Sequence, residues 1–142
     1  MNRYTKLNNQ LQALPDNEKD HAAIRDNETG LIWTANNVGE GRLQHAAAIE
    51  ACTKLTLGDQ TDWRLPTIKE LLSLVDYDSV DPAIDVDAFP SCKPNWYWSS
   101  SAYAGLPDYA WFVYFSYGNS NIFYRGLDGF VRAVRGPVAA SQ

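Results

Sequence analysis

Residues 62–71 read DWRLPTIKEL, and this stretch carries the clearest local signals in the chain. Thr67 and Glu70 have the spacing of a capping box, in which the threonine hydroxyl accepts from one free backbone N–H and the carboxylate accepts from another. Pro66 keeps the segment before it out of the helical conformation. The sequence therefore predicts a helix that begins after Thr67. Its buried side is expected to consist of Leu71, Leu72, Leu74 and Val75.

The segments before this helix favour a hairpin and a longer helix. Residues 22–25 and 31–34 are mainly apolar, and the link between them contains Asp, Asn and Gly, which is typical of a turn between antiparallel strands. Residues 42–57 are rich in alanine and place their apolar side chains on one side. They predict an amphipathic helix that ends at Gly58.

Residues 1–20 are polar apart from a few apolar positions. Leu7, Leu11 and Leu14 have helical spacing and are followed by Pro15. Three leucines are too few for a core of their own, so this segment is expected to be a short docking helix or an oligomer arm. A frayed tail is the alternative.

The chain changes character after Asp76. Residues 77–95 show little periodicity and contain three prolines, which predicts a long ordered loop. Short apolar runs separated by Gly, Pro, Asn and Ser follow and indicate strands at Trp98, 111–115, 122–124 and 131–135. Helices in the first half and antiparallel strands in the second predict an α+β domain.

Length and charge exclude several classes of protein. A chain of 142 residues suits one domain, and its 12 basic and 17 acidic side chains give a net charge of −5. Because the basic residues are scattered and phosphate groups repel an acidic surface, nucleic acid is not expected as a partner. No apolar run reaches the roughly 18 residues of a membrane span, and the first residues are polar. Neither membrane insertion nor a cleavable signal peptide is expected.

Five motifs occur in a fixed order along the chain. They are Asp26-x-x-Thr29-Gly30-Leu31-x-Trp33, the stretch at 62–71, Tyr97-Trp98-Ser99-Ser100, Ala110-Trp111-x-Val113-x-Phe115-x-x-Gly118 and Val131-Arg132-Ala133-Val134-Arg135. In this order they resemble the domain family named for the C-terminal domain of a collagen-like bacterial adhesin. The resemblance covers about residues 21–137, between an N-terminal segment at 1–20 and a tail at 138–142. It implies a branch of the C-type lectin fold that is related to the formylglycine-generating enzymes.

The motif residues are expected to form the scaffold. Four tryptophans are predicted core residues, because a buried indole removes a large apolar surface from water: Trp33, Trp63, Trp98 and Trp111. Three arginines are expected to donate to carbonyls and carboxylates, with anion binding or catalysis as the alternative: Arg64, Arg132 and Arg135. The family pattern further implies that Val113 and Phe115 face the core.

Aromatic residues are concentrated in one region, since twelve of the eighteen fall within residues 96–124. Side chains alternate along a strand, so Phe112 and Tyr114 point to solvent if Trp111 faces the core. Exposed aromatic side chains in a group are typical of a partner site, and a second small core is the alternative. The predicted ligand-binding residues are Ala102, Tyr103, Gly105, Tyr109, Phe112, Tyr114, Ser116, Tyr117, Asn119, Asn121, Phe123, Tyr124, Arg125, Leu127 and Asp128.

The same region uses few residue types. Apart from Trp111, residues 99–129 contain only twelve types, and all of them can be encoded by codons that end in a pyrimidine. Mutagenesis directed at the adenines of AAC and AAT codons leaves such a set. The resembled family includes the variable proteins of diversity-generating retroelements. The resemblance therefore implies a ligand-binding protein whose region at about 99–129 is diversified, and chance is the alternative.

Catalysis is not expected. The formylglycine-generating relatives need a reactive cysteine pair in a cleft, whereas Cys52 falls within a predicted helix and Cys92 within the predicted loop. These two residues are either buried thiols or a disulfide. His21 and His45 lie far from each other in the sequence. No catalytic residue, metal ligand or cofactor is predicted.

Two other binding functions are alternatives. A cluster of aspartates between 76 and 87 offers the oxygen ligands that calcium prefers, but it lacks the spacing of a known calcium loop, so a solvated acidic loop is favoured: Asp76, Asp78, Asp81, Asp85 and Asp87. The second alternative is an adhesion module with one fixed specificity. In each case the expected partner is a protein or glycan on a cell or particle surface, and the expected location is a virion or a cell surface.

Overall fold

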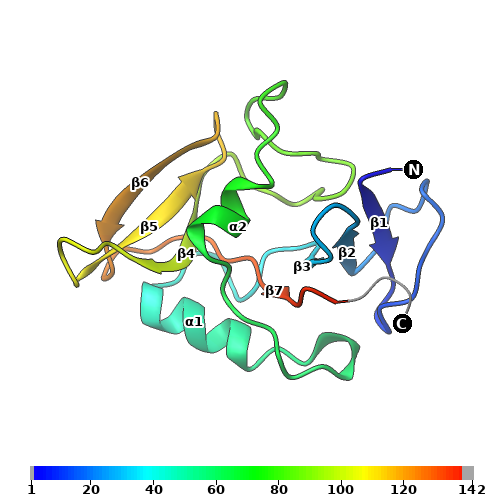
Figure 1. Ribbon diagram of the computed structural model, residues 1–142, viewed down its shortest axis with the longest axis horizontal. Coiled ribbons are helices and arrows are strands. Elements are labelled where there is room, and N and C mark those ends of the chain that lie inside the picture. The colour runs from blue at the N-terminus through cyan, green and yellow to red at the C-terminus, as the bar shows by residue number, and fades with distance from the viewer. Residues whose placement is uncertain (1, 139–142) are drawn as a thin grey trace.

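The computed structural model describes residues 2–138, so residues 139–142 of the predicted tail lie outside it. Within that range the chain forms two antiparallel sheets and two α-helices, which confirms the α+β class (Figure 1). The first sheet has the order β1-β2-β3-β7, with strands β1 (Tyr4–Leu7), β2 (Ala23–Asp26), β3 (Ile32–Thr34) and β7 (Val134–Arg135). The second has the order β4-β5-β6, with strands β4 (Trp96–Ala102), β5 (Tyr109–Tyr114) and β6 (Asn119–Tyr124).

The first sheet contains the predicted hairpin. β2 and β3 pair antiparallel, with Ile24 opposite Trp33. Between them Gly30 adopts a left-handed backbone conformation with φ of 79°, which a side chain would strain. The turn that the sequence predicts between these two strands is therefore present.

The N-terminal segment forms a strand, so the short docking helix, one of the alternatives predicted there, is wrong. Residues Tyr4–Leu7 pair with β2 as β1, and Leu14 N–H donates to the Lys6 carbonyl, which folds the following chain back over β1. Leu11 has φ of 61°, outside the right-handed helical region. Three leucines at helical spacing favour a helix only weakly, and the backbone hydrogen bonds offered by the edge of β2 override that preference.

Helix α1 (His45–Thr53) is shorter than the helix predicted at 42–57. Leu43 forms an isolated β-bridge with Gly129, so the chain turns into a helix only after Gln44. Gly58 lies in a separate 3₁₀ turn (Leu57–Asp59), where its φ is 70°. No helix of the described chain has the length and apolar character needed to cross a membrane.

Helix α2 (Ile68–Leu72) begins at the predicted capping box. Thr67 Oγ1 accepts from the Glu70 N–H at 3.2 Å, and a Glu70 carboxylate oxygen accepts from the Thr67 N–H at 2.9 Å. The same carboxylate accepts two hydrogen bonds from the Arg64 guanidinium, at 2.7 and 2.8 Å. Ile68 N–H donates to the Ser101 hydroxyl at 2.9 Å, which fixes the start of α2 against β4.

The β4-β5-β6 sheet has a core on each face. Tyr97 and Val113 pair across β4 and β5 and face a core that includes Leu71 of α2. Trp98 and Phe112, one residue further along each strand, face a second core together with residues of α1. The middle of the sheet is therefore covered on both faces, with α1 and α2 on opposite sides (Figure 1).

Most of the predicted scaffold residues lie where the sequence suggested. Trp33, Trp63 and Trp98 are buried. Arg132 is buried, donates to the Thr34 carbonyl at 2.6 Å and lies over the Phe89 ring. The Arg135 guanidinium bonds the Asp62 carboxylate at 2.8 Å. Arg132 therefore links the chain just before β7 to β3. Arg135 links β7 to the 62–71 stretch.

Residues 77–95 contain neither helix nor strand, which confirms the predicted long loop. Asp85 accepts from the backbone N–H groups of Asp87 and Ala88, and Ala83 N–H donates to the Phe115 carbonyl at 2.6 Å. The loop is therefore held both by its own aspartates and by the end of β5.

Candidate ligand-binding face

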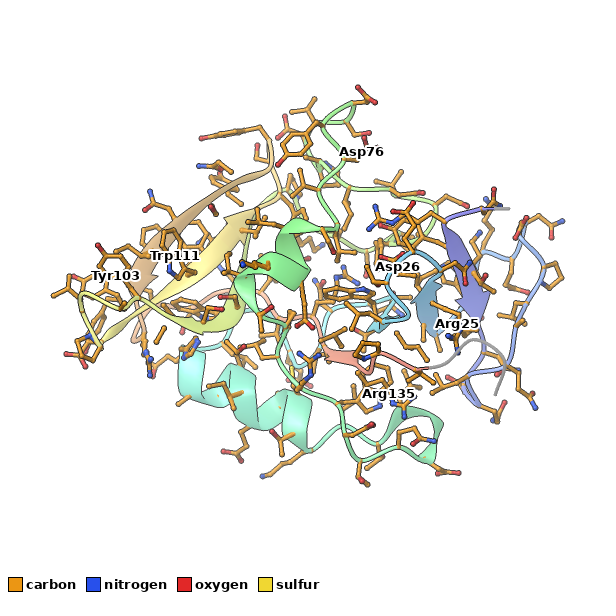
Figure 2. All side chains as sticks on the ribbon, in the orientation of Figure 1. Arg25, Asp26, Asp76, Tyr103, Trp111 and Arg135 are labelled. Atoms are coloured by element: carbon orange, nitrogen blue, oxygen red, sulfur yellow. The ribbon has the colours of Figure 1, made fainter. Side chains whose placement is uncertain are left out.

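One end of the β4-β5-β6 sheet carries aromatic side chains that are only partly covered. Tyr109 pairs with Tyr124, and Trp111 pairs with Ile122, so these four side chains point to the same face of the sheet. Tyr103 follows β4 and packs edge-on against Trp111, with ring centroids 5.8 Å apart. Figure 2 shows Tyr103 and Trp111 at the end of the sheet that lies beyond α2. We call these five residues the outer aromatic face.

The length of α2 explains why this face is open. Val113 is fully buried against the core beneath α2, whereas Trp111, two residues earlier on the same face, is only partly buried. Helix α2 has five residues and begins beside Ser101, which accepts from Ile68 N–H, so it does not extend over the end of the sheet beyond that point. Tyr124 is the most exposed member of the face, with 53% of its surface accessible.

Two glycines hold tyrosine rings of this face in place. A Cβ on Gly105 would lie 2.9 Å from the Tyr103 ring, and a Cβ on Gly126 would collide with the Tyr124 ring. Each ring therefore lies close to the backbone of the glycine two residues further along. Such rings lose little conformational entropy when a partner binds.

The turns beside the face add apolar surface. Leu106, 49% exposed, lies in the turn between β4 and β5, and Leu127, 45% exposed, follows β6. Leu127 was predicted as a ligand-binding residue and Leu106 was missed. An apolar residue between Gly105 and Pro107, both turn formers, was the available signal.

One prediction about β5 is wrong. Phe112, predicted to point to solvent, is only 3% exposed and stacks on Phe123 with centroids 4.5 Å apart. Trp111, predicted to be a core residue, is partly buried and packs against Tyr103 in the outer aromatic face. Strand alternation predicts one buried and one open face, but here α1 and α2 cover both faces at mid-strand. Distance along the strand, rather than the face alone, decides exposure.

The structure does not bring all fifteen predicted binding residues together. Eight are exposed: Ala102, Gly105, Tyr117, Asn119, Asn121, Tyr124, Leu127 and Asp128. Six are partly buried: Tyr103, Tyr109, Tyr114, Ser116, Phe123 and Arg125. Phe112 is buried. Tyr114 and Tyr117 form a separate pair, 5.6 Å apart, at the β5–β6 turn, where Ser116 donates to Asp81.

The acidic loop does not form a cation site. Within residues 2–138, no three His, Cys, Asp or Glu side chains converge on a point where an ion could bind. The aspartates instead hold the loop: Asp76 accepts from the Asp78 N–H and the Ser79 hydroxyl, and Asp87 bonds Lys6 and Lys19. Hydrogen bonds from these two lysines lower the pKa of Asp87.

A pocket of about 540 Å³ lies between β1 and this loop. Its lining includes Arg3, Tyr4, Asp76, Tyr77 and Asp85, and none of the outer aromatic face. Arg3 is already paired with buried Asp26 at 2.9 Å and with the Ser73 carbonyl at 2.9 Å. The pocket is therefore separate from the aromatic end of the sheet.

The cysteines and histidines serve the fold. Cys52 and Cys92 are buried free thiols in different cores, and burial raises the pKa of Cys52 to about 12. His45 Nε2 lies 2.8 Å from the Ser99 carbonyl, and burial lowers the pKa of His45. His21 Nε2 lies 2.8 Å from the Ala88 carbonyl. Each histidine thus links two segments of the chain that are distant in sequence through a backbone carbonyl.

Comparison of the chain with curated proteins found no match. The sequence profile of one domain family, the Lcl C-terminal domain, matches residues 22–135. The match begins at the hairpin and ends at β7, so it contains both sheets except β1. It agrees with the family that the five sequence motifs resemble, and it indicates an adhesion-related or ligand-binding domain. On this match the chain belongs to the Lcl C-terminal domain family.

Proposed function

We propose that this domain binds a protein or glycan ligand on a cell or particle surface through its outer aromatic face. The observation that carries the proposal is the partial exposure of Tyr103, Tyr109, Trp111 and Tyr124 side by side, on a sheet whose strands β4 and β5 contribute buried residues to two cores. Aromatic side chains on a rigid support are the residue types that dominate binding energy at interfaces.

The proposal includes diversification of residues 99–129 by a retroelement. Their restricted set of residue types supports it. The exposed members of this stretch lie in turns and on the margin of the sheet, where side chains change without emptying a core. Buried members such as Val113 and Phe115 would stay constant. The scaffold then presents different side chains on one backbone, as antibody loops do.

A binding role is proposed rather than a catalytic one. A nucleophile needs an accessible, easily ionised group with a base beside it. Cys52 is buried in α1 with a raised pKa, and His45 is occupied by the Ser99 carbonyl. These observations support a role in which the side chains contact the ligand and do no chemistry on it.

The gene tests diversification. We expect a nearby near-copy of the DNA that encodes residues 99–129, differing from it at adenines. The differences should fall at codons of exposed residues such as Tyr103, Tyr124 and Asp128, and should spare Val113 and Phe115. If no such copy exists, or if the differences fall mainly at codons of buried residues, the diversification proposal is wrong and the domain is an adhesion module of one fixed specificity.

Tyr124→Ala tests the binding face. The purified domain is screened against immobilised glycans and displayed surface proteins, and the affinity for each selected ligand is then measured for variants by surface plasmon resonance. Loss of a central aromatic anchor should weaken binding by about 30-fold, equivalent to ~2 kcal/mol.

Tyr77→Ala is the matched control. Tyr77 is 78% exposed and lines the pocket between β1 and the acidic loop, away from the aromatic face. We expect its replacement to leave affinity unchanged. If Tyr77→Ala abolishes binding and Tyr124→Ala does not, the ligand occupies that pocket and the proposed face is wrong.

A further inference from the structure

Strand β6 has a free edge. Within residues 2–138 it pairs with β5 on one side only, and Figure 1 shows no labelled element beyond it at the margin of the molecule. The other sheet edges are covered: Trp98 N–H donates to the Phe130 carbonyl along β4, Leu14 N–H reaches the Lys6 carbonyl along β1, and Val134 of β7 pairs with Arg64.

The register identifies which backbone groups of β6 are free. Arg125 N–H donates to the Asp108 carbonyl, in line with the β5–β6 register, so odd-numbered residues of β6 turn their backbone groups toward β5. The groups of Ser120, Ile122 and Tyr124 therefore point outward. The Ile122 N–H is taken by the Asn121 side chain at 2.8 Å, and the Tyr124 carbonyl accepts from Leu127 N–H.

The outward groups are arranged symmetrically about Ile122. Placed antiparallel against itself, β6 brings Ser120 opposite Tyr124 of a second copy and Ile122 opposite its own equivalent. Ser120 N–H then donates to the second copy's Tyr124 carbonyl, which also accepts from Leu127 N–H of its own chain. Tyr124 N–H donates to the second copy's Ser120 carbonyl. The two Ile122 residues also lie in hydrogen-bonding positions, so the exposed Asn121 side chain must leave the Ile122 N–H when the two edges meet.

Charge also favours a second copy as the occupant. β6 reads NSNIFY and contains no charged residue, in a chain of net charge −5. When two copies meet along this edge, no charged side chain of one β6 strand faces a like charge on the other. Contact through the acidic surface elsewhere would place like charges against each other. A long uncharged edge without proline or lysine is the kind that pairs with another strand.

We infer that two copies of this chain associate through antiparallel pairing of their β6 strands. The pairing joins two three-stranded sheets into one and places two outer aromatic faces side by side on it. It uses main-chain groups, so it tolerates changes of the exposed side chains. The inference does not depend on the proposed function, because the pairing of the two β6 strands needs no ligand.

Sedimentation velocity of the wild-type chain across a concentration series tests the inference. The contact is small, so we expect a weak dimer with a Kd of about 0.1 mM. Ser120→Pro removes one outward N–H and leaves the ladder with β5 intact, because proline is accepted on the open side of an edge strand. This variant should remain monomeric with an unchanged circular dichroism spectrum.

Charge reversal tests the register. Ile122→Lys and Ile122→Glu each place like charges opposite one another across the twofold axis, and each should weaken self-association by more than about tenfold. Mixed in equal amounts, the two variants should form a heterodimer. Ile49→Lys adds the same charge on α1, where Ile49 is 41% exposed, and should dimerise like the wild type.

Three results would overturn the inference. They are a wild-type chain that stays monomeric at millimolar concentration, a dimer that persists in Ser120→Pro, and folded Ile122 variants that do not associate when mixed. The first leaves the edge free for a strand of another protein, and the second assigns the dimer to a different surface.

Discussion

At the scale of single residues, β5 shows how neighbouring aromatic side chains acquire opposite roles. Phe112 stacks on Phe123 and contacts Trp96 within the core on the α1 side. Trp111 contacts Tyr103 on the other face and keeps part of its surface in water. The residue type alone does not separate these roles, since both are large aromatic residues that suit a core or an interface equally well.

Alanine substitutions should separate the two roles. Phe112→Ala empties a fully packed site and should lower the free energy of unfolding by about 3–5 kcal/mol. Trp111→Ala should cost less, because part of the indole is already solvated and no closed cavity forms. Urea denaturation of both variants measures the difference. An equal or larger loss for Trp111→Ala would show that Trp111 is a core residue after all.

At the scale of elements, α1 is joined to the sheet through a histidine at its first turn. The Ser99 carbonyl can only accept, so His45 Nε2 carries the proton in the 2.8 Å hydrogen bond. Burial, partly offset by this hydrogen bond, lowers the pKa of His45 below its ordinary 6.5, and the nearby Arg125 charge lowers it further. A charged imidazole would also oppose the positive end of the α1 dipole.

Stability should therefore fall in mild acid. The unfolded chain binds a proton at His45 near pH 6.5, whereas the folded chain binds it only at lower pH. The free energy of unfolding then decreases as the pH drops from about 7 toward the folded pKa, and it levels off below that value.

His45→Gln keeps a donor for the Ser99 carbonyl and does not titrate. Unfolding free energies of the two proteins, measured by urea titration between about pH 7 and 5, should show a steeper decline for the wild type. Parallel curves for the two proteins would mean that His45 has similar proton affinity in the folded and unfolded chains.

At the scale of the whole molecule, the described structure is larger than the family match. Residues before 22 lie outside the match, yet they supply β1, the buried side chain of Leu7 and the Arg3–Asp26 ion pair. The N-terminal segment is thus part of the folded body, and it forms one wall of the pocket beside the acidic loop. The aromatic end of the sheet lies away from that wall, so the two surfaces can vary separately.

Local sequence patterns were sufficient for features whose cause is local. The capping box at Thr67, the turn at Gly30 and the loop at 77–95 depend on neighbours within a few residues, and all three are present in the structure. The N-terminal strand could not be read from residues 1–20, because its hydrogen-bond partner is β2, sixteen or more residues away along the chain.

By itself, the sequence determined the α+β class, the family motifs, three buried tryptophans and the region where aromatic residues gather. Only the tertiary structure decided which of those aromatic residues reach solvent. Alternation along a strand assigns a side chain to a face, but exposure depends on how far α1 and α2 extend over that face. That reach is set by contacts between elements distant in sequence, which no local pattern encodes.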